Sequence, residues 1–146
     1  MQNYETISQD LINRLTLHYE PVGVIVYGES DPLPAEPAFT QKEYKSYCHA
    51  LVAAGEGEVL LLKKEQMGCK LGTSILGMDE DMEAYLGDGV LEKYGVGLFE
   101  TEEASSETIL KSWYLEKGKT QAALIAPLSY FKQIPQVVVF TANSEQ

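Results

Sequence analysis

The chain has 146 residues, 45% of them hydrophobic, and a formal net charge of −11 from 11 Lys and Arg against 22 Asp and Glu. This length suits one domain with a hydrophobic core, and the composition excludes a disordered chain. The acidic balance argues against a nucleic-acid-binding protein and against a protein of anionic membrane surfaces, since both select basic surfaces.

The N-terminal sequence lacks the features of a signal peptide. Residues 1–15 have no basic head and no apolar core. No apolar run approaches the roughly 20 residues that are needed to cross a bilayer. We therefore expect a cytoplasmic protein. Because thiols stay reduced in that compartment, Cys48 and Cys69 are expected to be free thiols, ligands or redox groups rather than a structural disulfide.

The first forty residues predict a helix, a strand and a long loop. Ile7, Leu11 and Leu15 recur at helical spacing, which predicts an N-terminal helix with His18 at its end. The apolar run at 21–28 is bounded by Pro and Gly and predicts a buried strand. Residues 29–40 contain three prolines and predict an irregular loop, and loops of this length often cover a site or an interface.

A second helix is predicted to begin after Thr40, which can cap it. Its apolar stripe consists of Tyr44, Tyr47, Cys48, Leu51 and Val52. This pattern places Cys48 on the buried face of the helix and His49 about 100° around from it. Gly55 is expected to end the helix.

Residues 67–72, with the sequence Met-Gly-Cys-Lys-Leu-Gly, predict a tight turn in which the backbone approaches another group closely. A short acidic helix is expected at 78–86. A later helix follows the polar residues 101–107 and ends at Gly118, with a buried stripe made of Ile109, Leu110, Trp113, Tyr114 and Leu115. We expect Tyr44, Tyr47 and Trp113 to pack in the core rather than to line a cofactor pocket.

The predicted strands lie at 22–27, 59–63, 97–100, 122–126 and 136–141. Interleaved with helices, they predict an α/β or α+β fold with a mixed sheet of about five strands and about four helices. The strands are apolar without alternation, so the sheet is expected to be covered on both faces. No linker divides the chain, and residues 1–146 are expected to form one domain.

Short motifs along nearly the whole chain resemble a prokaryotic family known as domain of unknown function 169. They are Pro21-Val22-Gly23-Val24, Tyr47-Cys48-His49-Ala50, Ala53-Ala54-Gly55, Gly68-Cys69 with Gly72 and Gly77, Ala126-Pro127-Leu128, and Pro135-Gln136-Val137-Val138. The family name implies no activity. The resemblance implies paired cysteines, placed here at Cys48 and Cys69. Family members usually continue past the strand at 136–141, so we expect this domain to lack their C-terminal segment and to use the surface it would cover for self-association.

The two cysteines are the strongest candidate site. Twenty residues separate Cys48 on a helix from Cys69 in a turn, so their sulfurs can meet. Zinc or an iron–sulfur cluster normally needs four protein ligands, and one chain offers these two with His49. A symmetric dimer would supply four cysteines. We therefore predict a homodimer, or another homo-oligomer, that binds a metal centre, most specifically an iron–sulfur cluster.

Two other interpretations remain open. Both cysteines can pack in the core as small hydrophobes, and the chain has no CxxC motif. Alternatively, Gly68, Lys70 and Gly72 can hold a small anion or cofactor through backbone N–H groups and one cation, although Lys70 can equally be a solvated lysine. The protein is then a non-catalytic ligand-binding or protein-interaction module, in which this turn and the Pro-rich loop frame a pocket.

The sequence contains no catalytic motif. It has no Walker A sequence and no dinucleotide-binding fingerprint. With only two histidines it offers no Ser–His–Asp or Cys–His–Asp set. No catalytic residue is therefore predicted, and whether the protein is an enzyme stays open.

Overall fold

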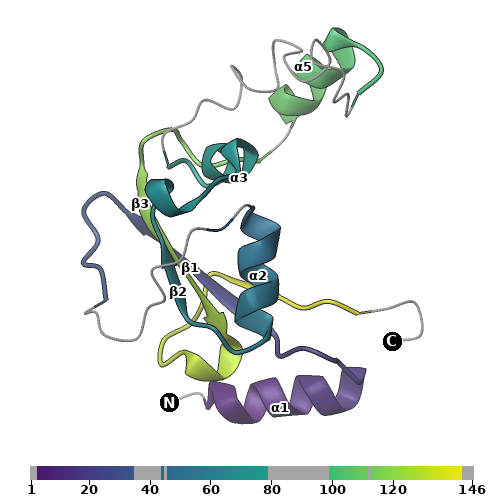
Figure 1. Ribbon diagram of the computed structural model, residues 1–146, viewed down its shortest axis with the longest axis vertical. Helices are drawn as coiled ribbons and strands as arrows, with labels where there is room; N and C mark the ends of the chain where they lie inside the picture. The colour runs from purple at the N-terminus through teal and green to yellow at the C-terminus, as the bar shows by residue number, and fades with distance from the viewer. Residues whose placement is uncertain (1–2, 35–43, 45, 79–98, 112, 143–146) are drawn as a thin grey trace.

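The computed structural model describes residues 3–34, 44, 46–78, 99–111 and 113–142. One antiparallel sheet organises this part of the chain (Figure 1). Its strands are β1 (Val22–Gly28), β2 (Leu60–Leu62), β3 (Thr120–Pro127) and β4 (Val137–Val139), in the order β2-β3-β1-β4. The described helices are α1 (Tyr4–Leu15), α2 (Tyr47–Gly55), α3 (Lys70–Ile75) and α5 (Glu102–Lys111), with two 3₁₀ helices, η1 (Lys64–Gln66) and η3 (Leu128–Tyr130).

The predicted mixture of helices and strands is confirmed, but the predicted mixed sheet of about five strands is not. The sheet has four strands, and its three pairings are all antiparallel. In the strand predicted at 97–100, residues 99 and 100 form a bend, and residues 97 and 98 lie outside the described part of the chain. The predicted acidic helix lies outside it too, apart from its first residue, Met78.

Strand β1 is one of the two inner strands of the sheet, the other being β3. It pairs with β3 from Val22 to Gly28, and its first three residues also pair with β4, where Val22 lies opposite Val139. A register shift between Tyr27 and Gly28 ends the regular β1–β3 pairing. The apolar run at 21–28 therefore forms an inner strand, as its lack of polar residues predicts.

Both faces of the sheet are buried over β1, β2 and β3, as the strand composition predicts, whereas the edge strand β4 is largely exposed. On one face, which we call the α2-side core, the sheet residues are Val22, Val24, Leu60, Leu62, Ala123 and Ile125. On the other, the α1-side core, they are Ile25, Tyr27, Leu61, Ala122, Leu124 and Ala126, covered by Tyr4, Leu128 and Phe131. Successive strand residues point to opposite faces, so each strand contributes to both cores.

Helix α1 confirms the predicted N-terminal helix. Asn3 caps it, with its side-chain oxygen accepting hydrogen bonds from the N–H groups of Glu5 and Thr6. Thr16 ends it in the left-handed conformation, and His18 lies exposed beyond the end. The helix packs beside η3 under the α1-side core (Figure 1).

The predicted start and buried face of the second helix are wrong. Helix α2 begins at Tyr47 with Ser46 as its N-cap, while Tyr44 lies outside it in an isolated parallel bridge with Met67. The buried residues of α2 are Ala50, Ala53 and Ala54, and Cys48 is exposed. Alanines let the helix backbone approach the sheet closely, whereas a hydrophobicity pattern gives more weight to the larger side chains on the other faces.

The predicted burial of the 113–115 segment is also wrong. Helix α5 ends at Lys111, and Trp113 is 98% exposed, with Tyr114 and Leu115 exposed beside it. The chain instead crosses the end of α3, where the Leu115 N–H donates to the Ile75 carbonyl at 3.0 Å. Gly77 makes this crossing possible, because an added Cβ would lie 2.5 Å from the Glu116 carbonyl oxygen. The side chains of Ile109 and Leu110 lie outside the described set.

No helix within the described ranges is long and apolar enough to cross a membrane.

Substitution of Gly23 tests the packing of the α1-side core. A Cβ at this position would lie 2.4 Å from Cε2 of Phe131. We expect Gly23→Ala to lower the free energy of unfolding by about 1–3 kcal/mol, because overfilling a packed core forces side chains and backbone to shift. Urea unfolding would measure the change.

The matched control is Gly23→Ala in a Phe131→Leu background, where the smaller side chain leaves room. The alanine should cost less there than in the parent chain. An equal cost in both backgrounds would show that the contact with Phe131 is not the cause.

Candidate functional site

Cys69 is the N-cap of helix α3 rather than a residue within a long glycine turn. Its Sγ accepts a hydrogen bond from the Gly72 N–H at 3.4 Å, and the residue packs partly buried against the α2-side core. The Thr73 hydroxyl donates to the Lys70 carbonyl at 2.8 Å within the same helix. The predicted turn is therefore a helix start that places one thiol against a backbone N–H.

Gly72 brings the starts of α2 and α3 together. A Cβ at this position would lie 3.1 Å from the Cβ of Tyr47 and 3.7 Å from the Cβ of Cys69. Tyr47 is the first residue of α2 and directly precedes Cys48. The two segments that carry the cysteines therefore contact each other at Gly72, and the absence of a side chain there allows this close approach without displacing Tyr47.

Both cysteines are free thiols, Cys48 exposed and Cys69 partly exposed. The interpretation of Cys48 as a core residue is therefore wrong. Burial raises the pKa of the Tyr47 phenol above its ordinary value, and the charge of the neighbouring Cys48 raises that pKa further. Tyr47 and Tyr44 are confirmed as core-packing residues, since Tyr47 packs against the α2-side core and Tyr44 is only 4% exposed.

His49 is exposed, and its ring packs edge-to-face against Tyr44 with 5.8 Å between the ring centroids. The Tyr44 hydroxyl in turn donates to Oε2 of Glu58 at 2.6 Å. Across the described ranges, no three His, Cys, Asp or Glu side chains form a group that could hold a metal ion. Cys48, Cys69 and His49 as a shared ligand set thus stay a prediction.

The turn predicted to hold an anion has its glycine donors in use. The Gly68 N–H donates to the Tyr44 carbonyl at 2.8 Å, and the Gly72 N–H donates to Cys69. Lys70 is exposed. Of the three residues, Lys70 alone keeps a donor group facing solvent.

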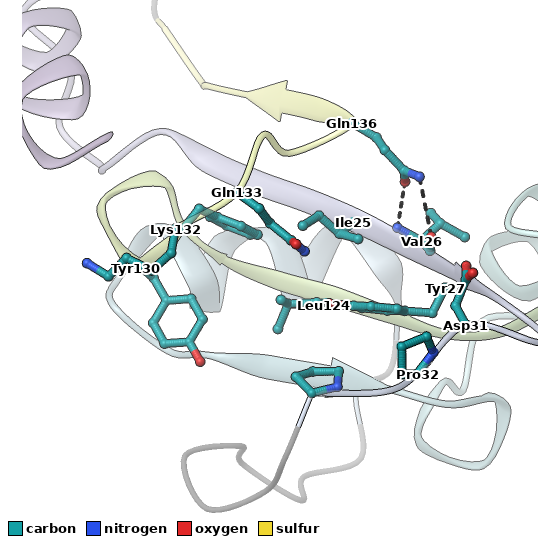
Figure 2. Close-up of a pocket in the computed structure, with 12 residues that line it drawn as sticks. Ile25, Val26, Tyr27, Asp31, Pro32, Leu124, Tyr130, Lys132, Gln133 and Gln136 are labelled. Carbon is teal, nitrogen blue, oxygen red and sulfur yellow. Dashed lines mark hydrogen bonds between the residues drawn. The ribbon is translucent and has the colours of Figure 1, made fainter. Parts of the chain in front are cut away.

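A second candidate site lies on the opposite face of the sheet. We call it the sheet groove, a cavity of about 780 Å³ (Figure 2). Its floor consists of Ile25, Tyr27 and Leu124. One wall is the start of the Pro-rich loop, with Asp31, Pro32 and Pro34. The other follows η3, with Tyr130, Phe131, Lys132 and Gln133.

Hydrogen bonds to the sheet hold the loop wall in place. The Gly28 N–H donates to Oδ2 of Asp31 at 2.7 Å. The Gln121 side-chain amide donates to the carbonyls of Gly28 and Asp31, at 2.7 and 2.6 Å. The loop wall is therefore joined to both β1 and β3.

Gln136 lines one edge of the groove, and its side chain forms hydrogen bonds with the backbone of β1 as a neighbouring strand would. Its side-chain Oε1 accepts from the Val26 N–H at 2.6 Å, and its Nε2 donates to the Val26 carbonyl at 3.4 Å (Figure 2). The Gln136 N–H also donates to the Val24 carbonyl at 3.0 Å. The side chain thus continues the β1–β4 pairing from the residue that precedes the start of β4.

Tyr27 lies among the polar groups of the groove. Burial raises the pKa of its phenol, the charges of Tyr130 and Asp31 raise it further, and a hydrogen bond with the Gln133 side chain opposes them. Asp31 lies next to Tyr27 at one end of the groove, and Tyr130 lies at the other end (Figure 2).

A second hollow, which we call the aromatic cleft, lies on the α2 side and has a volume of about 760 Å³. Its apolar lining includes Tyr47, Ile75, Trp113, Tyr114, Leu115 and Val137. All of these except Tyr47 are large exposed hydrophobic residues. Such a concentration of exposed apolar side chains is typical of an interaction surface.

The sequence did not reveal the residues of the η3 wall. Tyr130, Lys132 and Gln133 follow a buried strand without any motif, and only tertiary packing brings them to the Pro-rich loop. The single useful signal was the length of that loop, which predicted that it covers a site. Pro32 and Pro34 do line the groove, but the glycine turn at 67–72 does not take part in it.

Comparison with known proteins supports the resemblance. A family model described as Uncharacterised ArCR, domain of unknown function 169, matches residues 10–146. No curated protein matches the chain, and neither does any solved structure. The match spans all the motifs that suggested the family, so that prediction is confirmed.

The hydrogen bond beside His49 can be tested through Tyr44→Phe. Removing the hydroxyl should lower the free energy of unfolding by about 1–3 kcal/mol, since Glu58 loses a hydrogen-bond donor in a partly buried site. Urea unfolding at neutral pH would measure the loss. Tyr19→Phe, at a residue that is 46% exposed, is the control and should cost little.

The same pair predicts a loss of stability at alkaline pH. Burial, followed by the hydrogen bond to Glu58 and its charge, raises the pKa of Tyr44 well above the ordinary 10.0. The unfolded chain therefore releases this proton near pH 10, while the folded chain keeps it. The folded state then binds more protons, so stability falls as pH rises above about 10. Tyr44→Phe should flatten this slope and Tyr19→Phe should not; equal slopes would contradict the assignment.

Proposed function

We propose that this chain, which belongs to the uncharacterised family of domain of unknown function 169, binds a metal centre through Cys48 and Cys69 as a homo-oligomer. An iron–sulfur cluster is the specific form we favour. The observation that carries the proposal is that both thiols reach the surface, on two helix starts that contact each other at Gly72.

The environment of Cys69 suits a thiolate ligand. Its Sγ accepts the Gly72 N–H, and hydrogen bonds to ligating sulfurs stabilise their charge and tune the potential of iron–sulfur clusters. Cys48 needs no rearrangement to bind a metal because it is already exposed. Cys48 thus differs from a cysteine that packs as a small hydrophobe, and Cys69 combines partial packing with a sulfur that accepts a backbone hydrogen bond.

The number of ligands requires more than one chain. A closed site for zinc or an iron–sulfur cluster needs about four protein ligands, and the described part of one chain holds no group of even three candidates. Two chains related by a two-fold axis would contribute four cysteines, with His49 of each chain as a further donor.

The aromatic cleft supplies a surface for such an assembly. Each chain carries a net charge of −11, so two copies repel each other unless a charge-poor apolar surface joins them. The cleft offers exposed Trp113, Tyr114 and Leu115, and Tyr47, which precedes Cys48, lines the same cleft. Association through it would bring the Cys48 residues of two chains toward a common axis.

The alternative, a non-catalytic module that holds a small anion at Gly68, Lys70 and Gly72, has less support. Both glycine N–H groups already donate within the chain, which leaves one exposed lysine to hold the ligand.

Anaerobic purification followed by metal analysis and visible spectroscopy tests the proposal. We expect Cys48→Ser and Cys69→Ser each to reduce bound metal by at least about tenfold, which is the scale that changes in a metal's ligand environment produce. Val52→Ser is the matched control, because Val52 is exposed on the same helix as Cys48 and carries no thiol. It should leave the metal content unchanged.

Light scattering of the same samples tests the assembly. Trp113→Ala should shift the protein toward the monomer and lower the metal content together. The proposal fails if the parent protein is colourless and metal-free and both Cys→Ser variants have the same free energy of unfolding as the parent. It also fails if a monomer keeps the full metal content.

A further inference from the structure

The sheet groove differs from the cysteine site in its location and chemistry. It lies against the α1-side core, whereas both cysteines lie on the α2 side. Its volume of about 780 Å³ falls within the roughly 300–1,000 Å³ that is usual for small-molecule pockets. Nothing in the thiol proposal uses it.

The walls of the groove are held before any ligand arrives. The loop wall is fixed by the bonds of Asp31 and Gln121 described above. On the η3 wall the Phe131 N–H donates to the Leu128 carbonyl at 3.2 Å, and the Phe131 ring packs against Gly23. A ligand would therefore enter a preformed site with little ordering cost.

The groove combines aromatic faces with oxygen acceptors. Tyr27, Tyr130 and Phe131 are three aromatic residues along it, the last two packed edge-to-face with ring centroids 6.0 Å apart. The Asp31 carboxylate lies beside Tyr27, and the Gln133 amide reaches over Ile25 (Figure 2). Only one carboxylate oxygen, Oδ2, takes the Gly28 N–H, so Oδ1 remains an acceptor for a ligand.

The charge distribution favours a cation. Among the described residues that line the groove, Asp31 is the one carboxylate and Lys132 the one lysine, in a chain with net charge −11. The Lys132 ammonium extends away from the floor, whereas Gln133 reaches over Ile25 (Figure 2). Aromatic rings together with a carboxylate form the usual recognition site for an ammonium group.

We propose that the sheet groove binds a small organic cation, an amine or quaternary ammonium with an apolar body. The ammonium group faces Asp31 with the ring of Tyr27 beside it, and the apolar body extends over Ile25 and Leu124 toward Tyr130 at the other end of the groove (Figure 2). No covalent chemistry is part of this role, so the groove acts as a binding site.

Titration of the full chain with phenethylammonium and benzyltrimethylammonium, followed by NMR chemical-shift changes, tests the proposal. Phenylacetate serves as the anionic counterpart of similar shape. Both cations should bind more tightly than the anion, and the largest shifts should fall on residues of the groove. Binding of phenylacetate with equal or higher affinity would overturn the proposal, as would the failure of both cations to bind.

Two variants of equal charge separate local recognition from the general field. Asp31→Asn retains an oxygen for the Gly28 N–H, and Glu116→Gln removes the same charge from the aromatic cleft. Asp31→Asn should weaken cation binding about tenfold, the scale of a hydrogen-bonded charge pair, and Glu116→Gln should not. Equal weakening by both would show that only the net charge attracts the cations.

Asp31 also borders the aromatic cleft, so a second pair of variants locates the ligand. Tyr130→Ala, at a residue that is 38% exposed, should weaken binding, while Trp113→Ala should leave it unchanged. The reverse result would place the cation in the aromatic cleft and overturn the proposal. Metal content should stay constant in Asp31→Asn and Tyr130→Ala, which keeps this test independent of the cysteine proposal.

Discussion

The two-sided pairing of strand β1 is the constraint on which the rest of the described structure depends. Because β1 pairs with β3 on one side and β4 on the other, its backbone is used on both edges and its side chains alternate between two cores. Val22 and Val24 face helix α2, while Ile25 and Tyr27 face η3 and the Pro-rich loop. Both candidate sites take their position from this division.

On the α2 side, close packing determines which thiol meets solvent. Helix α2 lies against the sheet through alanines, so the residues on its far side, including Cys48, are left outside the core. Gly72 then allows the start of α3 to contact Tyr47, which brings the Cys69 segment to the start of α2. The thiol arrangement follows from three small residue types, Ala, Gly and Cys, placed at helix contacts.

On the other side, the Pro-rich loop and the η3 segment border the sheet groove over strands β1 and β3. Phe131 covers Gly23, and Tyr27 and Leu124 line the groove farther along the strands. The sheet surface therefore provides an apolar floor between two polar walls. A ligand in this groove and a metal centre at the cysteines would lie on opposite faces of the same sheet, so the two sites could be occupied independently.

Local apolar runs and short motifs predicted four of the five proposed strands, the helices at 4–15 and 47–55 in outline, the family, and the residue types of the candidate cysteine site. They did not predict which helix faces are buried, because that depends on contacts between segments distant in the sequence. Apolar residues flank Cys48 and Trp113 in the sequence, yet both side chains lie outside the core. Alanines occupy the face of α2 that packs on the sheet, so Cys48 faces solvent. Trp113 is exposed because the chain leaves the helix and crosses over α3 at residues 115–120. The sheet groove could not be predicted either, because its two walls, with Asp31 on one and Gln133 on the other, are about a hundred positions apart and face each other only through the β1–β3 pairing.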